Sequence, residues 1–180
     1  LQEQAPGTQV YKDLVEIESA AQRSLSVIRN FIDFSDNKNT RVESTDLHSL
    51  INRTIPLMKT SLRNHVVIKN LNAKHFTGDV NQPLFQQVLF NLIKNSIQAM
   101  DEKGRVLIET ENPTASTVKI SISDSGKGIP KAVQSLIFQP FFTTKDNLQG
   151  NGLGLSIVKS IVESFQGKIN FTSEDGKGTQ

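Results

Sequence analysis

The chain of 180 residues contains no cysteine and no tryptophan. The lack of cysteine excludes a disulfide framework and a thiolate metal site, and it fits a reducing compartment. We expect a cytoplasmic location. An excess of charge is also lacking, because 20 Lys and Arg are balanced by 18 Asp and Glu. We therefore expect no nucleic-acid partner. No run of 18 apolar residues occurs, so a membrane anchor of a longer parent protein would lie in upstream segments.

Residues 9–36 are expected to form one long helix. Apolar or small side chains recur at alternating spacings of four and three residues, at Val10, Leu14, Ile17, Ala21, Ser24, Ile28 and Phe31. This heptad stripe is typical of a seam for a partner helix, which would come from upstream or from a second chain. An ordinary amphipathic core helix is the alternative interpretation.

The rest of the chain mixes helical and strand patterns. Helices are expected at residues 46–62, 81–100 and 155–165, and strands at 66–68, 105–110, 117–123 and 169–171. The first of these helices follows the N-cap cluster Ser44–Asp46, and Pro83 lies in the first turn of the second. The two neighbouring strands between 105 and 123 predict a hairpin, which favours an α+β sandwich over a doubly wound parallel sheet.

Two asparagines are candidate ligands in the second of these helices. Asn91 and Asn95 are four residues apart, so they share one helix face. Amide oxygens are hard, neutral ligands of the kind that Mg²⁺ accepts. Hydrogen bonds between the helix and a loop are the alternative role of this pair.

A carboxylate follows the strand at 117–123. Asp124 opens a loop with glycines at positions 126 and 128. Glycine lets the backbone approach a ligand closely, and a carboxylate at the end of a strand can accept a hydrogen bond from an exocyclic amine. A plain Asp-Ser-Gly turn is the alternative interpretation.

A second glycine-rich segment, residues 150–155, opens the last predicted helix. Backbone N–H groups at the N-terminus of a helix form a phosphate site, although this segment is neither a P-loop nor a dinucleotide-binding fingerprint. The aromatic segment Phe138–Lys145 precedes it, and its phenylalanines are candidates for closing a loop onto the domain. Lys145 is either a phosphate contact or a solvated loop charge.

The order of these segments resembles the catalytic and ATP-binding domain of sensor histidine kinases, in the superfamily shared with gyrase, mismatch-repair and heat-shock chaperone ATPases. The matching residues are Asn91 and Asn95 in its N box, Asp124, Gly126 and Gly128 in its first glycine box, Phe138, Phe141 and Phe142 in its F box, Gly150, Gly152 and Gly154 in its second glycine box, and Gly176, Gly178 and Thr179 in its third. The segments 95–100 and 140–145 resemble the nitrogen-regulation and oxygen-sensing subgroup. The resemblance covers about residues 46–180 and implies a two-layer sandwich with a mixed sheet covered on one face by helices.

The resemblance also implies a domain organisation. Residues 1–36 resemble the second helix of the hairpin for dimerisation and histidine phosphotransfer, residues 37–45 a linker, and residues 46–180 the ATP-binding catalytic domain. The final strand of that domain would follow Thr179 and is expected to be missing, and the helix with the phosphoacceptor histidine would precede residue 1. None of His48, His65 and His75 matches a phosphoacceptor motif.

The function implied by the resemblance is that of a protein-histidine kinase in a two-component system. It would bind ATP with Mg²⁺, transfer the γ-phosphoryl group to a histidine of its own hairpin domain within a homodimer, and relay it to an aspartate in the receiver domain of a response regulator. Asn95 would hold the metal with Asn91 beside the phosphates, and Asp124 would bind the adenine amine with support from Thr179 through solvent. The other implied nucleotide contacts are Lys94, Gly126, Gly128, Ile129, Thr144, Lys145, Gly150, Gly152, Leu153, Gly154 and Leu155.

Two other functions compete with this hypothesis. Gyrase-type and chaperone ATPases use a glutamate in the N box to activate water, whereas the amide of Asn91 cannot take up a proton. A non-catalytic, ATP-responsive scaffold would tolerate degenerate glycine boxes, and the glycine boxes of this chain are intact. A protein-histidine kinase is therefore the leading hypothesis.

Overall fold

The computed structural model describes residues 8–18, 20–21, 41–100, 103–145 and 152–180. Its elements are, in chain order, strand β1 (Glu43–Asp46), helix α2 (Leu47–Leu57), strands β2 (His65–Leu71) and β3 (Thr77–Val80), helix α3 (Gln82–Ala99), strands β4 (Gly104–Thr114) and β5 (Thr117–Asp124), the 3₁₀ helix η1 (Lys131–Leu136), helix α4 (Gly154–Ser164), and strands β6 (Ser173–Glu174) and β7 (Gly178–Thr179). Residues 9–18 and 20–21 are also helical.

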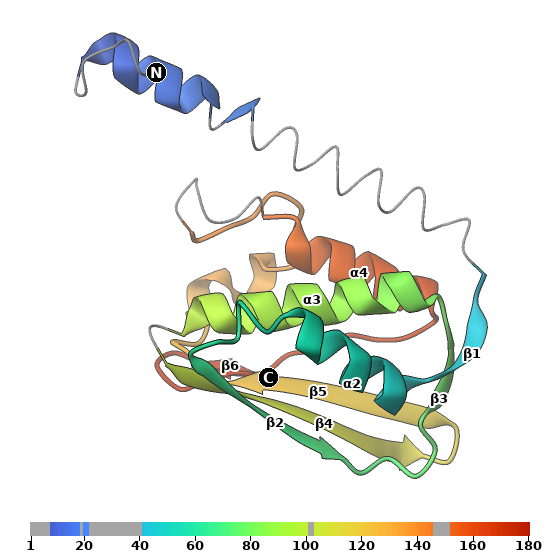
Figure 1. The fold of residues 1–180 in the computed structure, drawn as a ribbon. Coiled ribbons are helices and arrows are strands. Elements are labelled where there is room, and N and C mark those ends of the chain that lie inside the picture. Colours follow the sequence, from blue (N-terminus) through green and yellow to red (C-terminus); the bar gives the residue numbers. More distant parts are fainter. Residues whose placement is uncertain (1–7, 19, 22–40, 101–102, 146–151) are drawn as a thin grey trace.

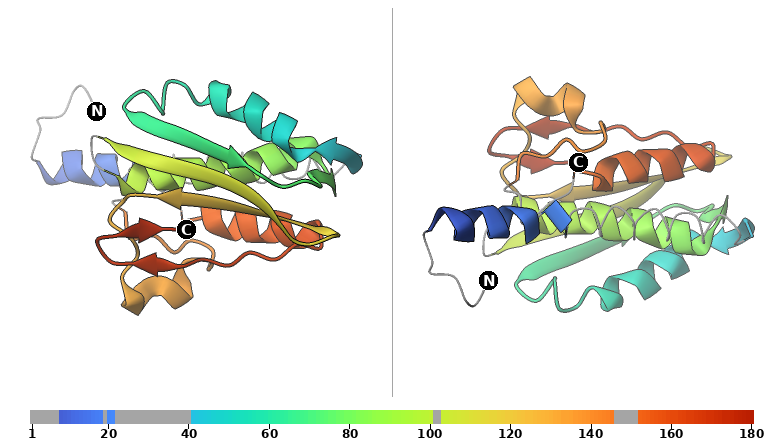
Figure 2. Two further views of the ribbon diagram at one scale, coloured as in Figure 1. Left: turned by 90° about the horizontal axis from the view of Figure 1, so that it is seen from below. Right: turned by 90° about the horizontal axis from the view of Figure 1, so that it is seen from above.

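Helices α2, α3 and α4 cover one face of a mixed sheet (Figure 1). The order of the five strands is β2-β4-β5-β7-β6, in which β2 and β4 run parallel and the other neighbours run antiparallel. Helix α3 lies along the middle of this face, between α2 and α4 (Figure 2). The expected α+β sandwich with a mixed sheet and a hairpin of β4 and β5 is therefore confirmed.

Local sequence signals define where α3 begins. The side chain of Asn81 caps the helix, since its Oδ1 accepts the N–H of Leu84 at 3.0 Å. Pro83 stands in the first turn, where a missing N–H removes no hydrogen bond within the helix. Both features fix the register of α3, and with it the direction in which Asn91 and Asn95 point.

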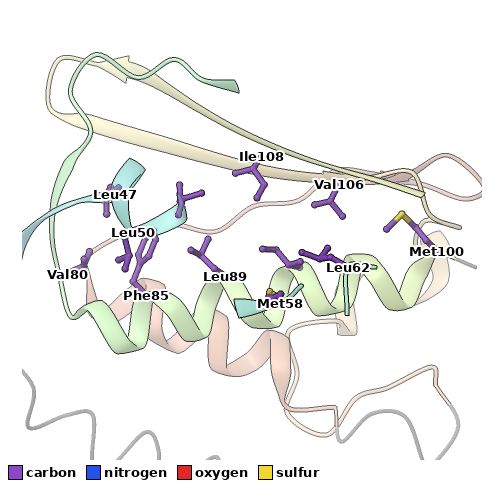
Figure 3. Packing of buried hydrophobic residues seen from close by; sticks show 12 residues of the cluster. Leu47, Leu50, Met58, Leu62, Val80, Phe85, Leu89, Met100, Val106 and Ile108 are labelled. Atoms are coloured by element: carbon purple, nitrogen blue, oxygen red, sulfur yellow. The ribbon is translucent and has the colours of Figure 1, made fainter. Parts of the chain in front are cut away.

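The main core fills the space between α3 and the sheet. Leu89 of α3 points toward Val106 and Ile108 of β4 (Figure 3), and all three are at most 1% exposed. A second cluster joins α3 to α4 and consists of Leu84, Val88, Val158 and Ile161. Helix α3 is thus held from two sides, because one of its faces packs on the sheet and another packs on α4.

Helix α2 is shorter than expected. It ends at Leu57 rather than at Leu62, and it contains Pro56, which has no backbone N–H to donate, in its last turn. The chain then continues in turns, in which Met58 N–H donates to the carbonyl of Ile55 at 3.0 Å. Leu62 remains buried all the same.

Two strand boundaries also differ from expectation. Strand β1 begins at Glu43, so the last residues of the predicted linker pair with β3 in a separate two-stranded sheet. The final predicted strand, at Ile169 and Phe171, is displaced to β6, which begins at Ser173. The alternation that suggested a strand reflects packing instead, since Ile169 joins the α3–α4 cluster and Phe171 contacts Phe138 edge to face.

The described part of the first predicted helix bears exposed seam residues. Val10 and Ile17 are 54% and 64% exposed, which agrees with a seam for a partner helix and leaves that partner a prediction. The seam positions from Ser24 onward lie outside the described residues. Across the described ranges, no helix has both the length and the apolar character needed to cross a membrane.

Leu50→Ala and Leu57→Ala form a matched test of this core, because both remove the same atoms from α2. Leu50 is 1% exposed and Leu57 is 68% exposed. Leu50→Ala should lower the free energy of unfolding by about 2–5 kcal/mol through lost burial and the cavity left behind. Leu57→Ala should change it by less than about 0.5 kcal/mol. Urea denaturation followed by circular dichroism measures both, and equal effects would contradict the packing of α2 on the core.

Candidate functional site

A cleft of about 940 Å³ lies beside α3, at the end of β5 and the beginning of α4. The segment that leads from Lys127 to Lys145 contributes further to its lining. Apolar side chains such as Ile129 and Phe142 line it together with polar groups such as Asn95 and Asp124. Its size and mixed lining are typical of a site for a small molecule.

The structure brings nearly all of the described candidate residues to this cleft. Those that line it are Asn91, Lys94, Asn95, Asp124, Gly128, Ile129, Thr144, Lys145, Gly152, Leu153, Gly154, Leu155 and Thr179. Gly126 is buried next to Asp124 without being part of the lining, and Gly150 lies outside the described residues. Five separate segments of the chain therefore converge on one place.

The beginning of α4 adjoins the asparagine face of α3. A Cβ atom placed on Gly154 would lie 3.5 Å from Asn91 Oδ1 and 3.9 Å from Asn95 Nδ2. The first N–H groups of α4 have no acceptor within the helix, because the first four N–H groups of any helix lack one. The cleft thus combines neutral amide side chains with the positive end of a helix dipole, which suits an anionic ligand.

Asp124 places a half-buried carboxylate at the end of β5. Its Oδ1 accepts the N–H of Gly126 at 2.9 Å, and the backbone of Thr179 and the side chain of Ser96 also hydrogen-bond to it. Burial raises the pKa of Asp124 above its ordinary value of 3.8, and these three hydrogen bonds counteract only part of the rise. The fold therefore holds a costly carboxylate at the cleft, which is a common sign of a functional group.

Ser96 is a site residue that sequence reasoning missed. It is 5% exposed, it follows Asn95 directly, and its side chain hydrogen-bonds to the carboxylate of Asp124. The available signal was a small polar residue on an otherwise apolar stripe of α3. Only the packing of α3 against the end of β5 reveals its partner.

The ammonium of Lys145 lies beside the amide oxygens of α3. Its Nζ donates to Asn95 Oδ1 at 3.3 Å and to Gln98 Oε1 at 2.6 Å. Desolvation lowers the pKa of Lys145, and the positive charges of Lys94 and Lys127 lower it further. Gln98 was also missed, although its spacing of three residues from Asn95 places both on one helix face.

This contact tests whether Asn95 fits the predicted metal. Its oxygen already accepts a hydrogen bond from a cation at the cleft, and Mg²⁺ prefers hard oxygen ligands as well. Among the described residues, no group of three or more His, Cys, Asp or Glu could hold a metal ion. The amide oxygen of Asn95 is a hard, neutral ligand at the cleft, which is compatible with Mg²⁺.

Two glycines with positive φ bring loops against the cleft. Gly178 has φ of +100°, and a Cβ there would overlap with the carbonyl oxygen of Asp124. Gly152 has φ of +65°, and a Cβ there would overlap with the backbone of Phe141. A side chain at either position would force the loops apart. The third glycine box thereby packs against the backbone of Asp124. The segment that leads into α4 packs against the backbone of the F box.

The three phenylalanines of the F box differ in placement. Phe138 and Phe142 line the cleft, and the ring of Phe138 lies 5.9 Å from that of Phe171. Phe141 is 66% exposed, and its φ of +67° is unusual for a bulky residue. The expectation that these aromatics close the loop onto the domain agrees with the contact of Phe138 with Phe171 and is wrong for the exposed Phe141.

Comparison with known families supports this combination of motifs. The model of the family described as histidine kinase-, DNA gyrase B- and HSP90-like ATPases matches residues 80–180. The matched region begins just before α3 and includes every described residue that was predicted for the site.

Individual proteins similar to this chain are named as sensor kinases. The chain is 33% identical to the sensor kinase CckA of Brucella abortus over 94% of its length, and 32% identical to the sensor histidine kinase ZraS of Escherichia coli over 98%. It spans only 20% and 38% of the length of these two proteins.

Solved structures share the fold. The catalytic domain of the histidine kinase ThkA matches with a TM-score of 0.69 and 31% identity, over 78% of this chain and 92% of that domain. The structure of ThkA in complex with the response regulator protein TrrA matches with a TM-score of 0.71 and 26% identity, over 99% of this chain and 51% of that one.

Replacing Asp124 by Asn should stabilise the ligand-free protein at neutral pH. Because the pKa of Asp124 is raised in the folded state, its contribution to stability is present below its unfolded pKa and is lost as the pH rises through the folded pKa. Asn keeps an oxygen for the N–H of Gly126 and carries no charge. The midpoint of thermal unfolding should therefore be higher for Asp124→Asn at about pH 7, by a margin that shrinks toward about pH 4.

Asp79→Asn is the matched control, since it also removes one negative charge but from an exposed position on β3. It should leave the midpoint nearly unchanged across the same pH range. A lower midpoint for Asp124→Asn than for the unaltered protein at neutral pH would show that its hydrogen bonds outweigh its desolvation.

Proposed function

Because this chain belongs to the family of histidine kinase-, DNA gyrase B- and HSP90-like ATPases, we propose that it is the ATP-binding catalytic part of a two-component sensor histidine kinase. The observation that carries the proposal is the meeting of Asn91 and Asn95, Asp124 and the beginning of α4 around one cleft. The nitrogen-regulation and oxygen-sensing subgroup is a finer assignment, which rests on the residues of segments 95–100 and 140–145 alone.

The adenine end of ATP is assigned to Asp124. The carboxylate accepts a hydrogen bond from the exocyclic amine, and Ile129 offers an apolar surface for the base in the same lining. Thr179 pairs with Asp124 across β5 and β7, which keeps it close enough to support the base through solvent. Guanine carries a carbonyl oxygen in place of this amine, so two acceptors would face one another.

The phosphates are assigned to the other end of the cleft. The N–H groups at the beginning of α4, together with the backbone of Gly152 and Gly154, donate to the β- and γ-oxygens. Asn91 adjoins this helix end, Lys94 supplies positive charge in the same lining, and Lys145 does so while the metal is absent. Asn95 contributes its amide oxygen to Mg²⁺, which when bound neutralises negative charge on the phosphates.

The proposed reaction transfers the γ-phosphoryl group to a histidine of the hairpin domain. The bond from the γ-phosphorus to the bridging oxygen breaks, a phosphorus–nitrogen bond forms, ADP leaves, and the imidazole proton passes to solvent. Residues of this chain bind and orient ATP for that step, which is the main task of a protein in phosphoryl transfer. Asn91 has no group that could activate water, which favours transfer over the hydrolysis of gyrase-type ATPases.

The proposed partners follow from the same scheme. The exposed seam of residues 9–18 and 20–21 joins the hairpin domain of a homodimer. A response-regulator receiver domain takes the phosphoryl group on an aspartate, a proposal supported by the similarity to ThkA, whose complex with a response regulator matches 99% of this chain.

Asn95→Ala should remove the increase in ATP affinity that Mg²⁺ produces, because an amide oxygen for the metal is lost beside the phosphates. Isothermal calorimetry with Mg²⁺ and with a chelator measures the two affinities. Asn64→Ala, an exposed asparagine in the turn before β2, is the control and should behave as the unaltered protein.

The same variant tests the activity in the full-length parent protein. Radiolabelled ATP should leave an acid-labile, alkali-stable label on the parent, and Asn95→Ala should abolish it. If ATP binding depends equally on Mg²⁺ in Asn95→Ala and in the unaltered protein, Asn95 is not a metal ligand. If the unaltered parent protein acquires no such label, the proposed kinase activity is refuted.

ATP should bind at least about tenfold more tightly than GTP, since guanine would set an acceptor against a partly desolvated carboxylate. Asp124→Asn should bind ATP more weakly and lose much of this preference, because the amide can turn its donor toward guanine. Competition of both nucleotides against a fluorescent ATP analogue measures the ratio. An unchanged ratio would show that Asp124 only forms the turn with Gly126.

A further inference from the structure

Lys145 is a cation held at the cleft by neutral oxygens. Its Nζ lies 2.6 Å from Gln98 Oε1 and 3.3 Å from Asn95 Oδ1, and both acceptors stand on one face of α3. Burial and the positive charges of Lys94 and Lys127 oppose a charged group here. The ion pairs identified within the described residues join other lysines, at positions 119, 159 and 177, to glutamates. The two amides are thus the contacts that offset the cost of placing this ammonium.

The position of the ammonium coincides with the acceptor assigned to the metal. An Mg²⁺ ligand must approach to about 2.0–2.1 Å, and two cations on one neutral oxygen would repel one another strongly in a partly desolvated cleft. Asn95 Oδ1 therefore cannot serve Lys145 and Mg²⁺ at the same time. One cation has to leave when the other arrives.

We propose that Lys145 is a resident cation that occupies the amide oxygens of Asn95 and Gln98 until Mg²⁺ arrives with the nucleotide and displaces it. The proposal rests on the proposed function, because it takes Asn95 as a metal ligand. It adds a specific role for Lys145 and Gln98, namely control over how strongly nucleotide binding depends on the metal. Gln98 is the positioning residue, since it makes the shorter contact to Nζ.

The exchange has an asymmetric consequence for binding. Without metal, the ammonium of Lys145 remains at the phosphate end and offsets part of the negative charge of the nucleotide. When Mg²⁺ is bound, the ion offsets this negative charge, and the ammonium of Lys145 no longer contacts Asn95. Removing Lys145 should therefore weaken metal-free binding while leaving metal-bound binding unchanged or slightly tighter, because the competitor is gone.

Calorimetric titration with a non-hydrolysable ATP analogue tests this asymmetry. Lys145→Met should weaken binding about tenfold in the presence of a chelator, as expected for the loss of one charge-assisted contact, and should not weaken binding in Mg²⁺. Lys131→Met removes one positive charge from an exposed position outside the cleft lining and should alter neither affinity. Lys94→Met removes another positive charge from the same lining and should weaken binding in both conditions alike.

A double variant separates the exchange from a general charge effect. In Asn95→Ala the oxygen shared by the two cations is absent, so adding Lys145→Met should no longer change the ratio of the two affinities. NMR gives a second readout, which does not depend on measuring an affinity for the nucleotide. The side-chain amide NMR signals of Asn95 and Gln98 should shift in Lys145→Met without metal, and in the unaltered protein when Mg²⁺ and the analogue are added together.

The outcomes distinguish the inference from the function on which it rests. Equal weakening by Lys145→Met in both conditions would make Lys145 an ordinary phosphate contact and overturn the exchange. No effect in either condition would overturn it as well and make Lys145 a solvated loop charge. Failure of the unaltered protein to bind the analogue at all would refute the proposed function itself.

Discussion

The double-sided burial of α3 is the constraint on which the rest of the structure depends. One face, with Leu89, packs on β4, and a neighbouring face, with Leu84, packs on α4. With two faces engaged, the helix cannot rotate without exposing one of two apolar clusters. The third face, which carries the amide side chains, is therefore held beside the start of α4 and the end of β5. The core thus sets the geometry of the cleft as well as the stability of the fold.

The cleft gathers groups that the fold would be more stable without. Asp124 keeps a carboxylate in a partly desolvated place, and Lys145 keeps an ammonium near two other lysines. Neither charge is neutralised by the other, because Asp124 hydrogen-bonds to Ser96 and backbone groups whereas Lys145 contacts amides. Such unpaired charges are typical of a site that is completed by a ligand with charge and donors of its own. A nucleotide offers an amine at one end and phosphates at the other.

The glycines explain how distant segments come so close together. Gly178 lets the third glycine box pack against the carbonyl of Asp124, and Gly152 lets the segment before α4 pack against the backbone of Phe141. Positive φ at both positions excludes most side chains before any question of ligand contact arises. These glycines therefore serve the assembly of the cleft walls, in addition to any backbone contact with phosphate.

The sequence by itself determined helices α3 and α4 and the hairpin of β4 and β5, and it singled out the segments that meet at the cleft. The cap at Asn81 and Pro83, the alternation in β4 and β5, and the spacing of the glycine boxes are local signals, because they act through the backbone of a few neighbouring residues. Only the tertiary structure decided that Ser96 hydrogen-bonds to Asp124, that Gln98 and Asn95 share the ammonium of Lys145, that Phe141 faces outward, and that Ile169 and Phe171 pack as side chains rather than form a strand. Each of these depends on which segments meet in space, and hydrophobic periodicity carries no information about the partner of a polar side chain across the fold.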